Sequence, residues 1–149
     1  MRKPRSPALD RRARRSAIVA RLTLTIFREM TRDFGHNDLA ECVPDLLISM
    51  AIRVNDEDGH APIALKQLER FTGISRRTVG RRINSLAKRG AFIFEEDVGV
   101  YGNDAYLEAR MEADFFINIM LAIAEAEEAL KKIDAEELAE LEEKALVKK

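Results

Sequence analysis

The most regular pattern of apolar and polar positions in this 149-residue chain lies between residues 65 and 92. Leu65, Leu68 and Phe71 recur at helical spacing on one face. Gly73 then supplies the positive φ that ends a helix at little steric cost. The pattern therefore predicts a short helix, a tight turn and a second helix.

The second helix has a start signal, a stop signal and a buried stripe. Ser75 is placed to be its N-cap, and we expect the helix to run through Arg89 and stop at Gly90. At 100° per residue, the apolar positions that share a narrow arc and should enter a core are Val79, Ile83 and Leu86. The helix also carries six basic residues and no acidic one, so its opposite face should be positively charged.

A basic helix buried along one stripe suits the DNA major groove, because Arg bonds guanine and Asn bonds adenine in bidentate fashion. The residues predicted to face DNA are Ser75, Arg76, Arg77, Thr78, Arg81, Asn84 and Lys88. Arg77 and Asn84 are expected to read base edges. Arg76 and Arg81 should contact bases or phosphates, and the other three should contact phosphates.

Three further residues of this helix carry predictions. Arg82 and Arg89 lie off the predicted DNA-facing side, and we expect them to be solvated or paired. Gly80 costs a helix interior about 1 kcal/mol relative to Ala, so we interpret it as a site of close approach by another surface, DNA being the natural candidate. The competing interpretation of the whole stretch is a solvated basic face on an ordinary core helix.

The order of these residues matches a known pattern, which reads Ser75-x-x-Thr78-Val79-x-Arg81-x-Ile83-x-x-Leu86-x-x-x-Gly90-x-Phe92. It resembles the recognition helix and the start of the wing in bacterial winged helix-turn-helix regulators, with MarR-type repressors as the nearest family. The resemblance implies that five residues approach DNA, namely Ser75, Arg76, Arg77, Thr78 and Arg81. It alone also implies a small-molecule effector, and no residue identifies that ligand.

The segment after Gly90 departs from the family pattern. A β-rich run at residues 91–94 and two strands around residues 97–103 predict a hairpin, which would be the wing. The wing of MarR-type proteins usually offers arginine to the minor groove. This one has no basic residue before Arg110, and its acidic residues are Glu95, Glu96, Asp97 and Asp104. Because phosphates would repel such a tip, we hypothesise that the N-terminal basic residues substitute for it.

Residues 1–15 hold seven Lys or Arg and one Asp, and Pro4 and Pro7 discourage helix. We predict a disordered basic arm, which either contacts phosphate or the minor groove or serves only as a solubilising tail. Residues 16–35 predict an amphipathic helix that ends at Gly35 and serves in dimerisation.

Residues 38–110 are predicted to form a winged helix-turn-helix DNA-binding domain. Its first helix should begin near Asp38 or Pro44 and run to about Val54. The expected buried face of that helix is Leu46, Leu47, Met50, Ala51 and Val54. Residues 61–63 are long enough for a short strand that pairs with the wing.

Residues 111–149 are predicted to supply C-terminal dimerisation helices. The segment from Phe115 to Ile123 is apolar nearly all the way round, so protein must enclose it, and two copies of the chain would do so. The apolar spacing slips near Asp134, which predicts packed helices and not one long coiled coil. An intramolecular helical pair in a monomer is the alternative.

Charge and composition narrow the function further. Residues 1–90 hold 19 basic and 10 acidic residues and residues 91–149 hold 6 and 16, an asymmetry typical of a nucleic-acid-binding region joined to something else. The single cysteine, Cys42, fits a reducing cytoplasm, and no apolar run is long enough to span a membrane. With two histidines and no glycine-rich phosphate loop we expect neither an enzyme nor a cofactor. The acidic loop at residues 55–60 fails the spacing of a calcium loop, so no metal is expected.

The predicted fold is mostly α with a small β wing (α+β), a winged helix-turn-helix domain flanked by N- and C-terminal dimerisation helices. The leading hypothesis is a homodimeric, sequence-specific transcriptional regulator that binds double-stranded DNA. A replication or partition factor of a plasmid or phage, or an architectural DNA-binding protein, would use the same fold. A winged helix used only for protein interaction is disfavoured by the six basic residues of the second helix.

Overall fold

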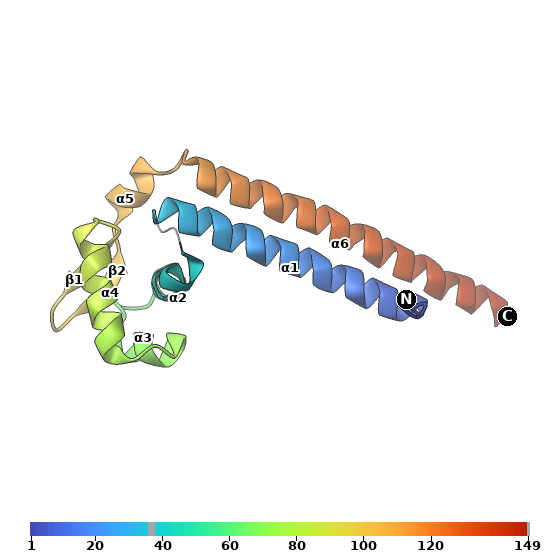
Figure 1. Cartoon of the computed structure of the whole chain (residues 1–149), viewed down its shortest axis with the longest axis horizontal. Helices are drawn as coiled ribbons and strands as arrows, with labels where there is room; N and C mark the ends of the chain where they lie inside the picture. Colours follow the sequence, from blue (N-terminus) through green and yellow to red (C-terminus); the bar gives the residue numbers. More distant parts are fainter. Residues whose placement is uncertain (36–37, 149) are drawn as a thin grey trace. The chain divides into compact units, whose positions relative to one another are not determined.

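The computed structural model describes residues 1–35 and 38–148, which form six helices and two strands (Figure 1). Their bounds are α1 Pro7–Asp33, α2 Leu39–Glu57, α3 Leu65–Thr72, α4 Arg76–Lys88, β1 Phe92–Glu95, β2 Gly99–Gly102, α5 Asp104–Ala109 and α6 Asp114–Val147. The α+β class, mostly helical with one small sheet, is thereby confirmed. The chain divides into a two-helix unit, Met1–Glu29 with Asp114–Lys149, and a central unit, Met30–Ala113.

In the two-helix unit, α1 and α6 run antiparallel, side by side, and are joined by ion pairs near one end (Figure 1). The paired residues are Arg11 with Glu140, Arg14 with Glu136, and Arg15 with Asp134 and Glu137. Toward the other end the Asn118 amide donates to the Glu29 carboxylate at 3.3 Å. Basic residues early in the chain are thus neutralised by acidic residues more than a hundred positions later.

The prediction of a disordered arm over residues 1–15 is wrong from Pro7 onward, because α1 begins there. Pro7 occupies the first helical position, where its missing N–H costs nothing, and Ser6 caps the helix by accepting from the Leu9 amide at 3.2 Å. The ion pairs to α6 remove the like-charge repulsion that a run of arginines would otherwise impose on a helix. Of the fifteen residues predicted to be disordered, only residues 1–6 lack regular secondary structure.

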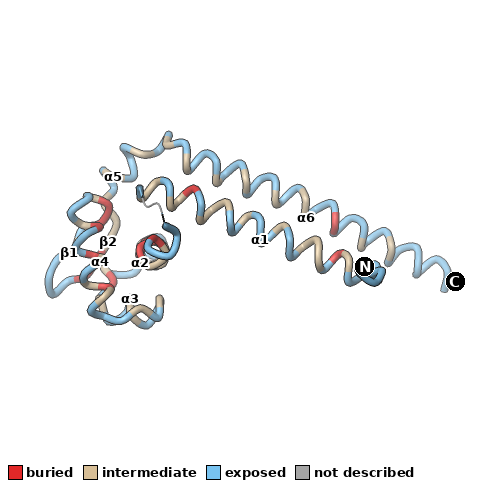
Figure 2. Tube along the Cα trace, viewed as in Figure 1, coloured by how far each residue is buried: buried red, intermediate tan, exposed pale blue. Residues whose placement is uncertain are grey.

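The C-terminal region forms one helix and not the several that were predicted, since α6 continues from Asp114 to Val147 through the slip in apolar spacing near Asp134. The apolar seam slips at Asp134 because acidic residues that pair with α1 replace apolar ones on that face. Most of this unit is exposed or half-buried (Figure 2), including the largest apolar residues in the first half of α6. These exposed residues are Phe116, Ile117, Met120, Leu121 and Ile123.

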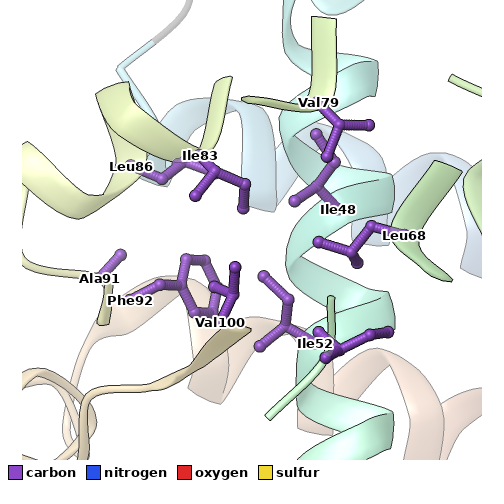
Figure 3. Close-up of a cluster of buried hydrophobic side chains, with 10 residues drawn as sticks. Ile48, Ile52, Leu68, Val79, Ile83, Leu86, Ala91, Phe92 and Val100 are labelled. Carbon is purple, nitrogen blue, oxygen red and sulfur yellow. The ribbon is translucent and has the colours of Figure 1, made fainter. Parts of the chain in front are cut away.

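The central unit has a compact apolar core made by α2, α3, α4 and the β1–β2 hairpin (Figure 3). The strands are antiparallel, with Phe92 opposite Gly102 and Glu95 opposite Gly99. The strand predicted at residues 61–63 is reduced to a single bridge, in which Ile63 and Val100 exchange both backbone hydrogen bonds. The buried core residues are Ile48, Ile52, Ile63, Leu68, Val79, Ile83, Leu86, Ala91, Phe92 and Val100.

The buried face of α2 differs from the prediction. Leu46 is buried as expected, but Val54 is 57% exposed, and Ile48 and Ile52 take the core positions. The observed buried stripe also includes the polar residues Asp45 and Ser49, which a hydrophobicity pattern assigns to the surface. Asp38 caps the helix by accepting from the Ala40 amide at 2.9 Å, so α2 begins before Pro44 and extends past Val54 to Glu57.

The first strand of the β hairpin, β1 at Phe92–Glu95, matches the β-rich run predicted at residues 91–94, and only one strand, β2 at Gly99–Gly102, lies within residues 97–103, where two were expected. Asp97, in the turn, has a φ of 66°, and the Val98 amide donates to the Glu95 carbonyl at 3.1 Å. Gly99 has a φ of 135°, and a Cβ there would lie 2.8 Å from the carbonyl oxygens of both Pro62 and Ile63. The hairpin therefore packs against the residue 62–63 backbone only because position 99 has no side chain.

We predict that Gly99→Ala destabilises the protein by about 2–4 kcal/mol, because Ala adds both backbone strain and a clash with main-chain atoms that cannot rotate away. The matched control is Gly80→Ala, where the added Cβ would lie 3.8 Å from the Leu65 side chain, an ordinary contact. Gly80→Ala should stabilise the protein by up to about 1 kcal/mol through helix propensity. Urea denaturation followed by circular dichroism measures both, and equal stabilities for the two variants would contradict the packing described.

We also predict a pH-dependent contribution from Glu136. Its hydrogen bonds from Arg14 lower the pKa of the Glu136 carboxyl. The stability from this pair is therefore present above about pH 4.3, the pKa of glutamate in an unfolded chain, and is lost as the pH falls through the lower folded pKa. Thermal denaturation should show Glu136→Gln melting below the wild type at about pH 7 and converging with it near pH 3.

Glu142→Gln is the control for this experiment, because Glu142 makes no ion pair among the described residues. Its melting temperature should follow that of the wild type across the range. A difference between Glu136→Gln and the wild type that persisted in acid would mean that the substitution acts through something other than charge.

Candidate nucleic-acid interface

The turn between α3 and α4 forms as the sequence predicts. Gly73 follows α3 with a φ of 73°, and its amide donates to the Glu69 carbonyl. The Ser75 side chain caps α4 by accepting from the Thr78 amide at 3.4 Å. Gly90 follows the last turn of α4 with a φ of 81°. The predicted bounds of the second helix are thereby confirmed to within a residue at each end.

One stripe of α4 is completely enclosed, as Figure 3 shows for Val79, Ile83 and Leu86. The residues on the opposite side are exposed, and in the part of the chain that the structure describes none of them makes an ion pair. We call this the outward face of α4, and it consists of Arg77, Arg81, Asn84 and Lys88. Two uncommitted guanidinium groups, an amide and an ammonium are therefore presented together on one rigid helix.

The other three predicted site residues sit at the N-terminal end of α4 and have partners within the central unit. Thr78 is half-buried and accepts a hydrogen bond from the Ser75 hydroxyl at 3.1 Å. The Nε atom of Arg76 lies 3.6 Å from the Glu69 carboxylate. Both side chains of that pair are substantially exposed, so it stabilises by about 1 kcal/mol at most and an anion could displace it.

Sequence reasoning missed two cations on α3. Lys66 and Arg70 are exposed and four residues apart, so they lie on one face of that helix. The four-residue spacing of Lys66 and Arg70 is present in the sequence and could have identified them. They add two positive charges to the same helix pair.

Gly80 lies at the edge of the outward face, and the neighbour that the structure shows for it is α3, so its approach by DNA stays a prediction. It is half-buried, and a Cβ built on it would meet Leu65 of α3. The wheel position of Gly80, between the buried stripe and the outward face, places it on the α3 side of α4. At this position α4 packs against α3 at an ordinary distance.

Arg82 and Arg89 have partners, as predicted. The Arg82 guanidinium donates to the Glu41 carbonyl at 3.2 Å and lies 3.6 Å from the Asp45 carboxylate. Arg89 donates to the Phe34 carbonyl at 3.1 Å, and its guanidinium carbon lies 5.3 Å from the centre of the Phe34 ring. Both arginines are thus directed to partners on one flank of α4, with Arg82 half-buried and Arg89 exposed, and they leave the outward face to the others.

The β hairpin carries the opposite charge. Glu95, Glu96 and Asp97 are exposed at its tip. The Tyr101 hydroxyl donates to Glu95 at 2.7 Å, and this hydrogen bond raises the pKa of the tyrosine. Such a tip repels phosphate, so an anionic partner of the central unit would have to be held by α3 and α4.

The N-terminal basic residues do not form the mobile arm that would replace the wing. Arg11, Arg14 and Arg15 are held by acidic residues of α6. The cations outside α1 are those of the irregular first six residues, namely Arg2, Lys3 and Arg5. Arg12 of α1 is also exposed and donates to the Ser16 hydroxyl. The hypothesis that the N-terminus substitutes for the wing is thus restricted to these four residues.

Part of the face predicted to be the core of α2 lines an open hollow of about 790 Å³ in the central unit. Its apolar lining includes Leu47, Met50 and Val54 of α2 and Phe71 of α3, which is 74% exposed. Leu47, Met50 and Val54 do form an apolar stripe on α2, as their spacing predicts. The stripe borders a surface depression and not the closed core.

No family model, curated protein or solved structure matches the chain. Within residues 1–35 and 38–148, none of the helices has the length and apolar character needed to cross a bilayer.

Proposed function

We propose that this protein is a sequence-specific DNA-binding transcriptional regulator that acts as a homodimer in the cytoplasm. The observation that carries the proposal is the outward face of α4, where Arg77, Arg81, Asn84 and Lys88 are exposed opposite a fully buried stripe and make no ion pair within residues 1–35 and 38–148. An α-helix fits the major groove, and Arg and Asn are the side chains that recognise guanine and adenine there. The helix pair α3–α4 with the β1–β2 hairpin would then be a winged helix-turn-helix domain of the MarR-like kind.

The roles of individual residues follow from where they lie. Arg77 and Asn84 are proposed to read base edges, and Arg81 and Lys88 lie beside them to contact bases or phosphates. Ser75, Arg76 and Thr78 at the start of α4 would meet phosphate, where the helix dipole also favours an anion. Lys66 and Arg70 of α3 would contact the backbone, as the first helix of such a pair does. The acidic hairpin would point away from the duplex.

A homodimer is supported by the two-helix unit. Phe116, Met120 and Ile123 fall on one side of α6 at 100° per residue, and all three are exposed in the single chain. Large apolar side chains grouped in this way mark an interface more often than a free surface. We propose that the same region of a second copy covers them, which would give the two-fold arrangement that two α4 helices need to meet one duplex.

Selection of bound fragments from a random duplex pool, at a fixed ionic strength of about 0.15 M, tests the proposal. We expect enrichment of a two-fold symmetric motif whose half-sites are about one helical turn, 34–36 Å, apart. A pool that stayed random would overturn sequence-specific binding. A single asymmetric motif would retain DNA recognition and overturn the homodimer. A selected motif that recurs in the genome at an origin of replication and not at promoters would favour a replication or partition role.

Substitutions on the outward face separate base contacts from phosphate contacts. Arg77→Ala should cost about 1–3 kcal/mol on the selected site and relax the preference at one base position. Lys88→Ala should weaken binding evenly on all sequences and lower the slope of log K against log salt by about 0.9. Titrations of a selected and a scrambled duplex at several salt concentrations measure both. An equal loss on both duplexes for Arg77→Ala would reassign that residue to phosphate.

A further inference from the structure

We propose that Arg82 and Arg89 are positioning residues, which set the rotation of α4 about its axis and so determine whether its outward face can read bases. This inference rests on the proposed function, in which α4 enters the major groove. The two residues are seven positions apart, so they lie within about 20° of each other on one flank of the helix. That flank is distinct from both the buried stripe and the outward face.

The apolar stripe alone holds α4 only loosely against rotation. Hydrophobic contact is non-directional, so Val79, Ile83 and Leu86 can stay buried through a small turn of the helix. Such a turn matters at the outward face. A side-chain end about 6 Å from the axis moves about 2 Å when the helix rotates by about 20°, which is enough to break a base hydrogen bond that tolerates a few tenths of an ångström.

Arg82 supplies a directional restraint at the middle of α4. Its side chain is 24% exposed and faces the Asp45 carboxylate of α2, which is 8% exposed, at 3.6 Å. Its hydrogen bond to the Glu41 carbonyl fixes the guanidinium to the backbone of the same helix. Because Asp45 is buried and Arg82 is partly buried, the two charges attract each other more strongly than a surface pair does, so this contact resists rotation.

Arg89 supplies a second restraint at the C-terminal end of α4. Its hydrogen bond to the Phe34 carbonyl and its position over the Phe34 ring hold this end to the segment that precedes α2. The N-terminal end is held separately by the Gly73 turn, which joins it to α3. The helix is therefore restrained at three points along its length.

Asp45→Asn gives the sharpest test, because simple electrostatics leaves the ratio of specific to non-specific affinity unchanged, whereas positioning lowers it. Removing a negative charge should tighten binding to any DNA by reducing repulsion. If Asp45 orients α4 through Arg82, the isosteric change should instead lower the ratio of specific to non-specific affinity at least tenfold. Arg82→Met should lower the ratio similarly, and the double variant should lose no more than either single one. Arg82→Lys, which keeps the charge facing Asp45, should recover part of the loss.

The salt dependence of binding provides the control. Arg82→Met and Asp45→Asn should leave the slope of log K against log salt unchanged, because neither residue is proposed to touch phosphate. Arg81→Met, on the outward face, is the matched variant and should lower the slope by about 0.9 if it contacts phosphate. A comparable fall in the slope for Arg82→Met would identify Arg82 as a phosphate contact and overturn the inference.

The remaining outcomes are separable. A wild-type protein with no preferred duplex would refute the proposed function before any variant is made. Specific binding that survives Asp45→Asn unchanged would refute only the positioning role. If circular dichroism shows that the Asp45 and Arg82 variants are unfolded, Arg89→Met decides the question, since Arg89 is exposed at the helix end. It should reduce the ratio severalfold at an unchanged slope, and an unchanged ratio would overturn the proposal.

Discussion

Burial of one stripe of α4 is the constraint on which the rest of the central unit depends. Val79, Ile83 and Leu86 are fully enclosed by α2, α3 and the hairpin. With three residues held inside, the other side chains of the helix point to the flanks or outward, to within the small rotation that the apolar stripe allows. The five basic residues of α4 and Arg89, which follows it, are therefore sorted by position, with Arg77, Arg81 and Lys88 pointing outward and the rest turned to the flanks.

This sorting explains why net charge by itself misleads. The first 90 residues carry a large excess of basic residues, which suggests a basic surface of matching size. Within the two-helix unit, Arg11, Arg14 and Arg15 pair with acidic residues of α6, and Arg82 of the central unit faces Asp45. The positive charge left for a partner is thus smaller than composition implies, and on the central unit it is concentrated on α3 and α4.

The sequence predicted best the parts of the fold that local chemistry determines. The Gly73 turn, the Ser75 cap and the end of α4 at Gly90 depend on neighbouring residues, and all three were placed correctly. The errors came from partners far away in the sequence. Residues 7–15 are helical beside acids of α6, and α2 buries polar Asp45, which faces Arg82. Hydrophobic periodicity carries no information about such pairs.

The acidic hairpin links the proposed mode of DNA recognition to the proposed dimer. In the family that the sequence resembles, the wing adds contacts beside those of the recognition helix. Here Glu95, Glu96 and Asp97 remove that contribution, so one copy would read only the few base pairs that a single helix reaches. Each mismatched pair costs about 1–3 kcal/mol, and a handful of positions cannot single out one site among the millions in a genome. A second copy doubles the number of base pairs read without any new residue. The exposed apolar side of α6 and the negative charge of the hairpin are therefore connected. A DNA-binding protein whose hairpin makes no contact with DNA would need a second copy to recognise enough base pairs.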